Sequence, residues 1–290
     1  MKGVRELKRR LKGVQNIRKI TKAIELVAST KLRRLQDRAA ATRPFANQLA
    51  AIMKRVAGGA DPSASPLLRV HDEVKDVAVL VIAGDKGLCG SYNSNVFRAA
   101  VPVIRQLVAE GKKPHLWIMG RRAGAYFAKV KDVDVAWVYP DPVEKIEFAA
   151  VKRLAKDFME GFVEGRFQEV RVVYTALRTA TSFRPTVQGV LPVPKPEVTD
   201  DAASDYILEP EAQTILDRLL PRFVEMQLFA AILESLAAEF GSRRIAMKNA
   251  TDNAGDMISS LSKEYNKARQ SGITAELLEI SGGAEALREV

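Results

Sequence analysis

The stretch VRELKRRLKGVQNIRKITKAIELVASTKLRRL, residues 4–35, decides the fold. Its apolar side chains recur every three or four residues, at Val4, Leu7, Leu11, Val14, Ile17, Ile20, Ile24, Val27 or Ala28, Leu32 and Leu35. This period places them along one face of a helix for more than four heptads. The first proline is Pro44, so residues 1–57 are predicted to form one helix that kinks or restarts there. A helix of that length is on the order of 80 Å long, and a compact domain cannot bury it.

The other end of the chain carries the same pattern. Residues 210–281 are predicted to be helical, with Pro221 tolerated as a kink and the end of the helix at Gly282 and Gly283. Its apolar positions are Ile215, Leu219, Phe223, Met226, Phe229, Leu233, Leu236, Phe240, Ala246, Ala250, Ala254, Met257, Leu261, Tyr265 and Ala268. Neither helix can bury its apolar face alone, so we expect the two to pair as an antiparallel coiled coil. The C-terminal helix is the longer one, so one end should extend unpaired.

Between the helices the hydrophobic period changes to that of an α/β domain. Strands are predicted at residues 75–83, 114–119, 133–138, 169–174, 185–192 and 206–208. Helices are predicted at residues 93–110, directly after Gly120, and at 143–164. This alternation predicts a Rossmann-like domain with a mainly parallel, doubly wound sheet. The predicted division is 1–57 for the first helix, 75–208 for the α/β domain and 209–290 for the second helix.

The net charge of +10 is unevenly distributed. Residues 1–57 hold 16 Lys and Arg side chains against three acidic ones, a net charge of +13, and the remaining 233 residues carry −3. Such a segment is typical of a nucleic-acid-binding arm, which is one interpretation. The basic residues, however, alternate with the apolar face along the whole helix. That arrangement favours a rod that lies inside or alongside an acidic protein partner.

The glycine-rich loop GDKGLCGS, residues 84–91, stands between a predicted strand and a helix. It lacks the Gly-Lys-Ser/Thr ending of a phosphate-binding loop and the spacing of a dinucleotide-binding loop. We therefore interpret it as a tight turn with a close backbone approach and Cys89 as a packed side chain. A nucleotide-binding, Rossmann-like enzyme is the weaker alternative.

Catalytic and metal sites find no support in the sequence. The single cysteine excludes an intramolecular disulfide and a cysteine-based zinc cluster, and His71 and His115 lack the spacing of metal ligands. We expect no catalytic residues, no metal and no cofactor. No uncharged apolar stretch reaches 18 residues, and the N-terminus lacks the apolar segment of a signal peptide, so an intracellular, mature chain is expected.

Three segments together resemble one protein family. They are VQNIRKITKAIELVASTKLRR at residues 14–34, GLCG at 87–90, and residues 247–270 with ITAELLEI at 273–280 and Gly283-Ala284. They resemble the gamma-subunit family of F-type ATP synthases, bacterial type, the central rotor shaft of the F1 sector. The resemblance covers the whole chain.

The resemblance implies a function. The chain would transmit torque between the membrane c-ring and the catalytic α3β3 hexamer, coupling ion (proton) transport to ATP synthesis, and would itself be non-catalytic. The implied partners are the alpha and beta subunits, the epsilon subunit and the c-ring, with one copy per complex and no nucleic acid. It would be a peripheral membrane protein on the cytoplasmic face of the bacterial inner membrane.

The resemblance also implies contact residues. The positions that match the family's contacts with the inner surface of the hexamer are Lys22, Ile24, Arg269, Gln270, Thr274 and Glu276. Ile24 departs from the family, which commonly has Met there, and Ser281 replaces a typical apolar residue. The redox-regulatory cysteine insertion of chloroplast members is absent from this sequence, so thiol regulation is not expected.

Overall fold

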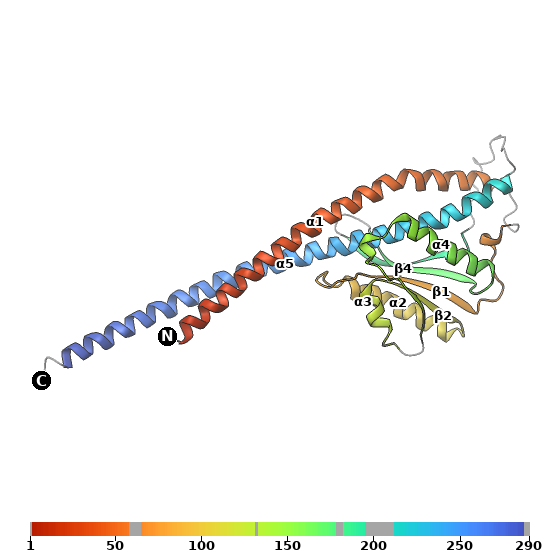
Figure 1. Cartoon of the computed structure of the whole chain (residues 1–290). Coiled ribbons are helices and arrows are strands. Elements are labelled where there is room, and N and C mark those ends of the chain that lie inside the picture. Colours follow the sequence, from red (N-terminus) through yellow and green to blue (C-terminus); the bar gives the residue numbers. More distant parts are fainter. Residues whose placement is uncertain (1, 58–64, 131–132, 178–181, 195–211, 287–290) are drawn as a thin grey trace. The chain divides into compact units, whose positions relative to one another are not determined.

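A computed structural model describes residues 2–57, 65–130, 133–177, 182–194 and 212–286 (Figure 1). The chain divides into two compact units. The terminal unit comprises residues 1–28 and 244–290, and the body unit comprises residues 29–243. The boundaries expected from the sequence, 1–57, 75–208 and 209–290, stay a prediction. The strand expected at 206–208 lies outside the described residues.

Both long helices are present. Helix α1 spans Lys2–Ala57 and includes Pro44, and helix α5 spans Ala212–Ala286 and includes Pro221. The predicted end of α5 at Gly282 and Gly283 is wrong, because the helix continues to Ala286. Glycine lowers helix stability by about 1 kcal/mol but keeps its N–H donor, so two glycines do not have to end a helix.

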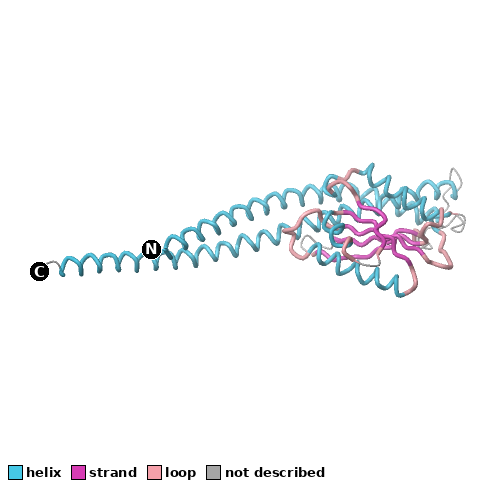
Figure 2. Tube along the Cα trace, turned by 60° about the horizontal axis from the view of Figure 1, so that its bottom comes forward, coloured by secondary structure: helices cyan, strands magenta, loops and turns pink. Residues whose placement is uncertain are grey.

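In the terminal unit the two helices run antiparallel, as predicted (Figures 1 and 2). The Thr251 hydroxyl of α5 donates a 2.8 Å hydrogen bond to the Thr21 hydroxyl of α1. One turn further along, Gly255 faces Arg18, so later residues of α5 meet earlier residues of α1. Thr21 and Thr251 are both buried, as is Ala254, so this contact is made by small side chains.

The contact face of α1 agrees with the predicted one at both ends and differs from it around Ile17 and Ile20. Its least exposed positions follow a strict heptad through Val4, Leu7, Leu11, Val14, Thr21, Ala28, Leu32 and Leu35. Ile17 and Ile20, which were expected on this face, are instead more than half exposed, at 54% and 59%. Of the two alternatives Val27 and Ala28, Ala28 is the buried one and Val27 is 54% exposed. The physical reason is that two long helices stay in contact only along positions that alternate at spacings of three and four residues. Each of these apolar residues stands one residue before such a position. Met257 of α5 is likewise exposed, and its neighbour Ile258 is half-buried in its place.

The body unit contains a five-stranded sheet. Its strands are β1 (Asp76–Ile82), β2 (Lys113–Met119), β3 (Asp134–Val138), β4 (Glu169–Leu177) and β5 (Phe183–Leu191). Their order is β3-β2-β1-β4-β5, with β5 antiparallel to β4 and the other neighbours parallel. The mainly parallel, doubly wound sheet is therefore confirmed. Burial on both faces explains the unbroken apolar run of β1.

Helices lie on both sides of this sheet (Figure 2). Val77, Val79 and Val81 of β1 pack in a core with α2 (Tyr92–Ala109) and α3 (Arg121–Phe127). On the other face, Trp117 of β2 packs against Phe158 of α4 (Phe148–Val163) at 4.8 Å between ring centres. The short helix η2 (Pro66–Leu68) precedes the sheet.

The helix predicted at 143–164 is divided in two. The first part is the short helix η3 (Val143–Lys145), and α4 starts only at Phe148. The backbone of Ile146 between them is extended, with φ −61° and ψ 130°, and this conformation cannot continue a helix.

Within the body unit, α5 is buried on most sides. Lys31 and Arg38 of α1 lie over the Phe240 and Phe229 rings, at 5.2 and 5.9 Å from the ring centres, so the antiparallel pairing also holds here. Leu216, Leu220 and Val224 are the buried positions, where Ile215, Leu219 and Phe223 were predicted. The buried Ser235 hydroxyl lies 2.8 Å from the Tyr92 hydroxyl of α2. Helix α5 therefore crosses the end of the sheet where the parallel strands terminate.

Candidate interaction surface

The glycine-rich loop lies at the carboxyl end of β1. The Asp85 carboxylate accepts hydrogen bonds from the backbone N–H of Arg121, at 3.1 Å, and of Val143, at 2.8 Å. Leu88 and Gly90 have left-handed backbones, with φ of +61° and +57°. Cys89 is buried, and burial raises the pKa of its thiol. The interpretation as a tight turn with a packed cysteine is confirmed.

Helix α5 occupies the space beside this loop. The Arg243 guanidinium donates to the Glu239 carboxylate at 2.6 Å and to the Gly87 carbonyl at 3.2 Å. A side chain at Gly84 would come within 2.9 Å of the Glu239 carboxyl group. Burial raises the pKa of Glu239, and the neighbouring Arg243 opposes this rise. Doubly wound folds bind ligands at this end of the sheet, whereas here an ion pair of α5 fills the region around the loop.

The six contact residues implied by the resemblance lie on the terminal unit. Lys22 is exposed and pairs with Glu25 at 3.1 Å, and Ile24 is half-buried. All four positions on α5 are exposed, namely Arg269, Gln270, Thr274 and Glu276. The Thr274 hydroxyl donates to the Gln270 carbonyl at 3.0 Å, a bond within the helix.

The structure separates these residues into two groups. The contact of Thr21 with Thr251 places Lys22 and Ile24 beside the part of α5 near residue 250. Arg269 lies about 20 residues further on, which is roughly 30 Å along a helix. The two groups are therefore at different levels of the terminal unit and do not form one site.

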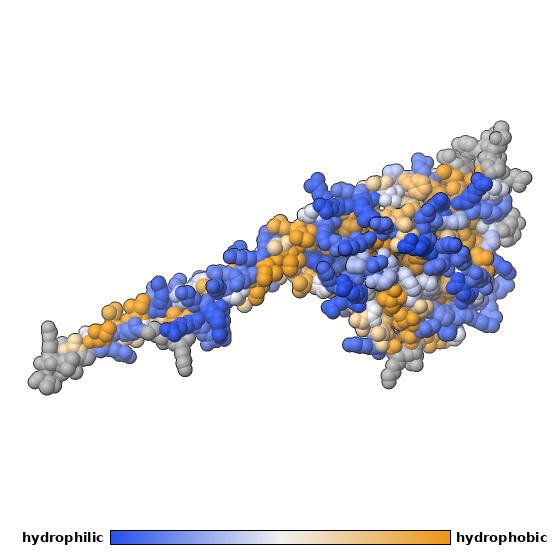
Figure 3. Space-filling view, viewed as in Figure 1, coloured by the Kyte–Doolittle hydropathy of each residue, from blue (hydrophilic) through white to orange (hydrophobic). Residues whose placement is uncertain are grey.

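Two exposed apolar faces were not recognised in the sequence. The outer stripe of α1 consists of the exposed Ile17, Ile20 and Val27 together with the half-buried Ile24, next to the paired face. The end segment of α5, residues 273–280, exposes Ile273, Leu277, Leu278 and Ile280, at 49% to 69%. Figure 3 shows apolar side chains at the surface near the C-terminal end of this helix. The sequence did contain a sign of the outer stripe, because its apolar residues each stand one residue before a heptad position.

These faces are suited to protein contacts. Soluble proteins rarely expose several large apolar side chains in a row unless another surface covers them. None of the helices in the described segments is long and apolar enough to cross a bilayer. The same segments hold no group of three His, Cys, Asp or Glu residues that could bind a metal ion.

A comparison with protein families decides the relationship. The sequence profile of the family described as ATP synthase matches residues 3–287. The ATP synthase gamma chain of Legionella pneumophila (strain Corby) is 36% identical over 292 residues, which cover 99% of this chain and 100% of that protein. The chain belongs to the ATP synthase gamma-chain family. The gamma chain of Geobacter metallireducens is 38% identical over 289 residues, with the same coverage.

A solved structure agrees with the fold. A chain in the Euglena gracilis mitochondrial ATP synthase (OSCP/F1/c-ring, rotational state 3) is similar with a TM-score of 0.65 and 19% identity. The match covers 98% of this chain and 94% of that one. The predicted architecture of two long terminal helices and a central α/β domain is confirmed. These comparisons give no support to the alternative of a nucleic-acid-binding protein.

Proposed function

We propose that this chain is the central stalk of an F1Fo ATP synthase and transmits torque between the c-ring and the α3β3 hexamer. It would thereby couple proton transport to ATP synthesis. The observation that carries the proposal is the exposed apolar end segment of α5 in a chain of the gamma family. A helix that extends past its partner and exposes leucine and isoleucine requires a surrounding protein surface.

The contact surface proposed for the hexamer has two levels. Arg269 and Gln270 precede the end segment of α5, and Thr274 and Glu276 lie within it; all four would bind the inner loops of the hexamer. Lys22 and Ile24 would contact it at the level of the outer stripe, where Arg18 and Lys19 add positive charge. An acidic lining of the hexamer would complement the charge of +13 on residues 1–57.

The assembly follows from this role. The proposed partners are the alpha, beta and epsilon subunits and the c-ring, with one gamma chain per complex. The chain would be held at the cytoplasmic face of the bacterial inner membrane through the c-ring and would itself be non-catalytic. The two long helices would form the shaft.

Purification from native membranes tests the proposal. A tagged copy of this chain should co-purify with the alpha and beta subunits in a complex that contains one copy of it, as measured by native mass spectrometry. Recovery only as a free monomer would contradict the assignment.

A double substitution tests the proposed contact level at the end of α5. Arg269→Ala with Gln270→Ala should weaken assembly or coupling about tenfold or more, because bonds to a charged partner contribute about 1.5–3 kcal/mol. The measurement is proton-driven ATP synthesis in membrane vesicles, together with the amount of F1 bound to them. Lys263→Ala with Glu264→Ala, also exposed on α5, is the matched control. Unchanged synthesis in the first variant would remove these two residues from the proposed surface.

A further inference from the structure

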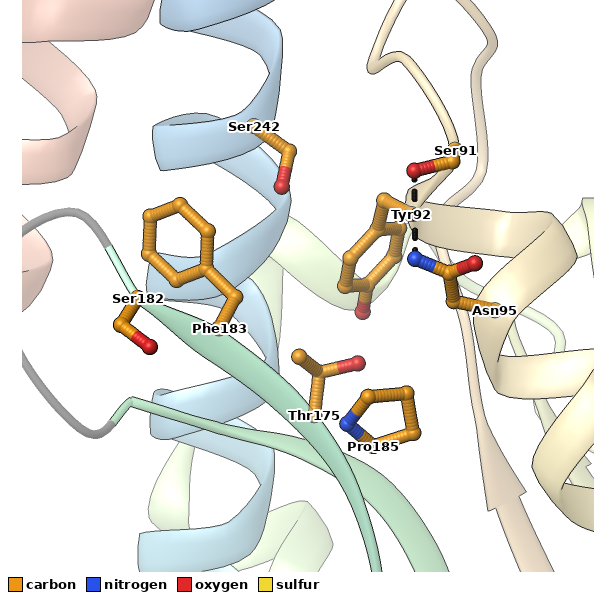
Figure 4. Close-up of a pocket in the computed structure, with 8 residues that line it drawn as sticks. All are labelled: Ser91, Tyr92, Asn95, Thr175, Ser182, Phe183, Pro185 and Ser242. Atoms are coloured by element: carbon orange, nitrogen blue, oxygen red, sulfur yellow. Dashed lines mark hydrogen bonds between the residues drawn. The ribbon is translucent and has the colours of Figure 1, made fainter.

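A cavity of about 330 Å³ lies in the body unit beside the loop described above (Figure 4). Residues before and in α2, in β4, before and in β5, and in α5 line it: Ser91, Tyr92, Asn95, Thr175, Ser182, Phe183, Pro185 and Ser242. At about 30 Å³ per water, it has room for roughly ten water molecules or one small organic compound.

The position of the cavity is that of a ligand site in this class of fold. The chain leaves β1 through α2 towards β2 on one side, while β4 pairs with β1 on the other. In doubly wound sheets, ligands bind outside the carboxyl ends of the strands at this change of direction. Glu239 and Arg243 fill the part around the glycine-rich loop, and the cavity lies next to it, at Tyr92 and the end of β4.

The polar groups of the cavity are neutral and mostly hydroxyls. The Asn95 amide donates to the Ser91 hydroxyl at 3.1 Å, which leaves the Ser91 proton available as a donor. The Thr175 side chain points towards the space between the Tyr92 and Phe183 rings (Figure 4). Thr175 is only 3% exposed, and its hydroxyl oxygen has no hydrogen-bond partner among the described residues.

Besides the position of the cavity, the unpaired Thr175 hydroxyl also indicates a ligand. Burying a hydroxyl without a partner is unfavourable, and folded proteins rarely leave one unpaired. The neighbouring hydroxyls of the inner wall make other bonds, because the Ser235 hydroxyl lies 2.8 Å from that of Tyr92 and accepts a 3.4 Å hydrogen bond from the Thr175 backbone N–H. A molecule in the cavity that exchanges a hydrogen bond with Thr175 would remove this cost.

We propose that this cavity binds a small uncharged polyhydroxylated compound of about the size of a hexose. Hydroxyl and carboxamide side chains exchange hydrogen bonds with such a ligand, and the Tyr92 and Phe183 rings offer apolar faces to its C–H groups. An anion fits less well, because none of the described lining residues is cationic. Two arginines close to lining residues in the sequence bond elsewhere: Arg98 donates to the Asn95 side-chain oxygen at 3.2 Å, and Arg243 donates to the Glu239 carboxylate at 2.6 Å.

Ligand-observed NMR on the full chain tests the site, with glucose, myo-inositol and orthophosphate as probes. Saturation transfer to at least one polyol, with millimolar affinity, is the expected result. Thr175→Val keeps the shape of the side chain and removes its hydroxyl, so the affinity should fall about tenfold or more. Thr186→Val is the matched control, since Thr186 lies on β5 outside the cavity and bonds to the Arg184 carbonyl.

The free protein gives an independent readout. Because the Thr175 hydroxyl is unpaired, Thr175→Val should leave the urea midpoint unchanged or higher, while ligand binding is lost. If that variant does not fold, Ser242→Ala removes a hydroxyl from the opposite wall and should weaken binding in the same way. Saturation transfer to neither polyol, binding of phosphate alone, or polyol binding that neither Thr175→Val nor Ser242→Ala weakens would overturn the proposal.

Discussion

Replacing Gly120 with alanine should unfold the body unit, at a cost of more than about 4 kcal/mol. Gly120 precedes α3 and has φ +99° and ψ 128°, a conformation that costs residues with a side chain about 1–3 kcal/mol. A Cβ atom there would lie 2.2 Å from the Ala83 carbonyl oxygen and 3.1 Å from that of Gly84. Both are backbone atoms at the end of β1, so the strand itself would have to move.

The urea unfolding curve of the full chain measures this effect. Trp117 and Trp137, the two tryptophans of the sequence, both lie in strands of the body unit, so their fluorescence reports on this unit. Gly111→Ala is the matched control, since Gly111 also has a positive φ of +73° but no atom within 4 Å of an added Cβ. Gly111→Ala should lower the free energy of unfolding by only about 1–2 kcal/mol. If the two variants lose equal free energies of unfolding, the backbone at Ala83 can move aside for the added Cβ atom, which would contradict the prediction.

The fold was largely predictable because the sequence shows clearly both the heptad spacing of the long helices and the continuous apolar runs of the buried strands. The heptad from Val4 to Val14 and the apolar run of β1 each allow one kind of element only. The contact face of α1 was harder to predict, because Ile17 and Ile20 compete with Arg18 and Thr21 for the same turn. Hydrophobicity favours the isoleucines, whereas continuous pairing with α5 requires the heptad positions, and the pairing decides.

The candidate surfaces were less predictable from the sequence. An apolar residue is normally assigned to the interior, so exposed Leu277 and Leu278 are recognised only when the partner helix is seen to end. The buried pair of Glu239 and Arg243 carries no sequence signal, because the same i, i+4 spacing on an exposed helix is a common surface pair. Only the path of α5 across the sheet distinguishes the two cases.

That path leads to the second large effect, which is expected for Glu239→Ala. The carboxylate and the Arg243 guanidinium have side-chain exposures of only 8% and 9%. Removing one partner leaves the other charge buried and uncompensated, which costs about 3–5 kcal/mol. Because Arg243 also donates to the Gly87 carbonyl, the loss would loosen α5 from the end of the sheet. In the assembled enzyme, a loosened α5 should lower ATP synthesis more than ATP hydrolysis, because synthesis depends on torque passing through this helix.

A paired substitution separates lost charge balance from lost packing. Glu239→Leu with Arg243→Met replaces both charges by apolar side chains of similar length and should recover most of the stability that Glu239→Ala loses. Glu160→Ala removes an equally spaced pair with Lys156 that is exposed at 50% and 69%, and should change the urea midpoint little. A double variant no more stable than Glu239→Ala would mean that polar contacts at Gly87, rather than an unpaired charge, hold α5 to the sheet. Comparing the three urea midpoints with synthesis rates in vesicles then shows whether the coupling follows the stability of this contact.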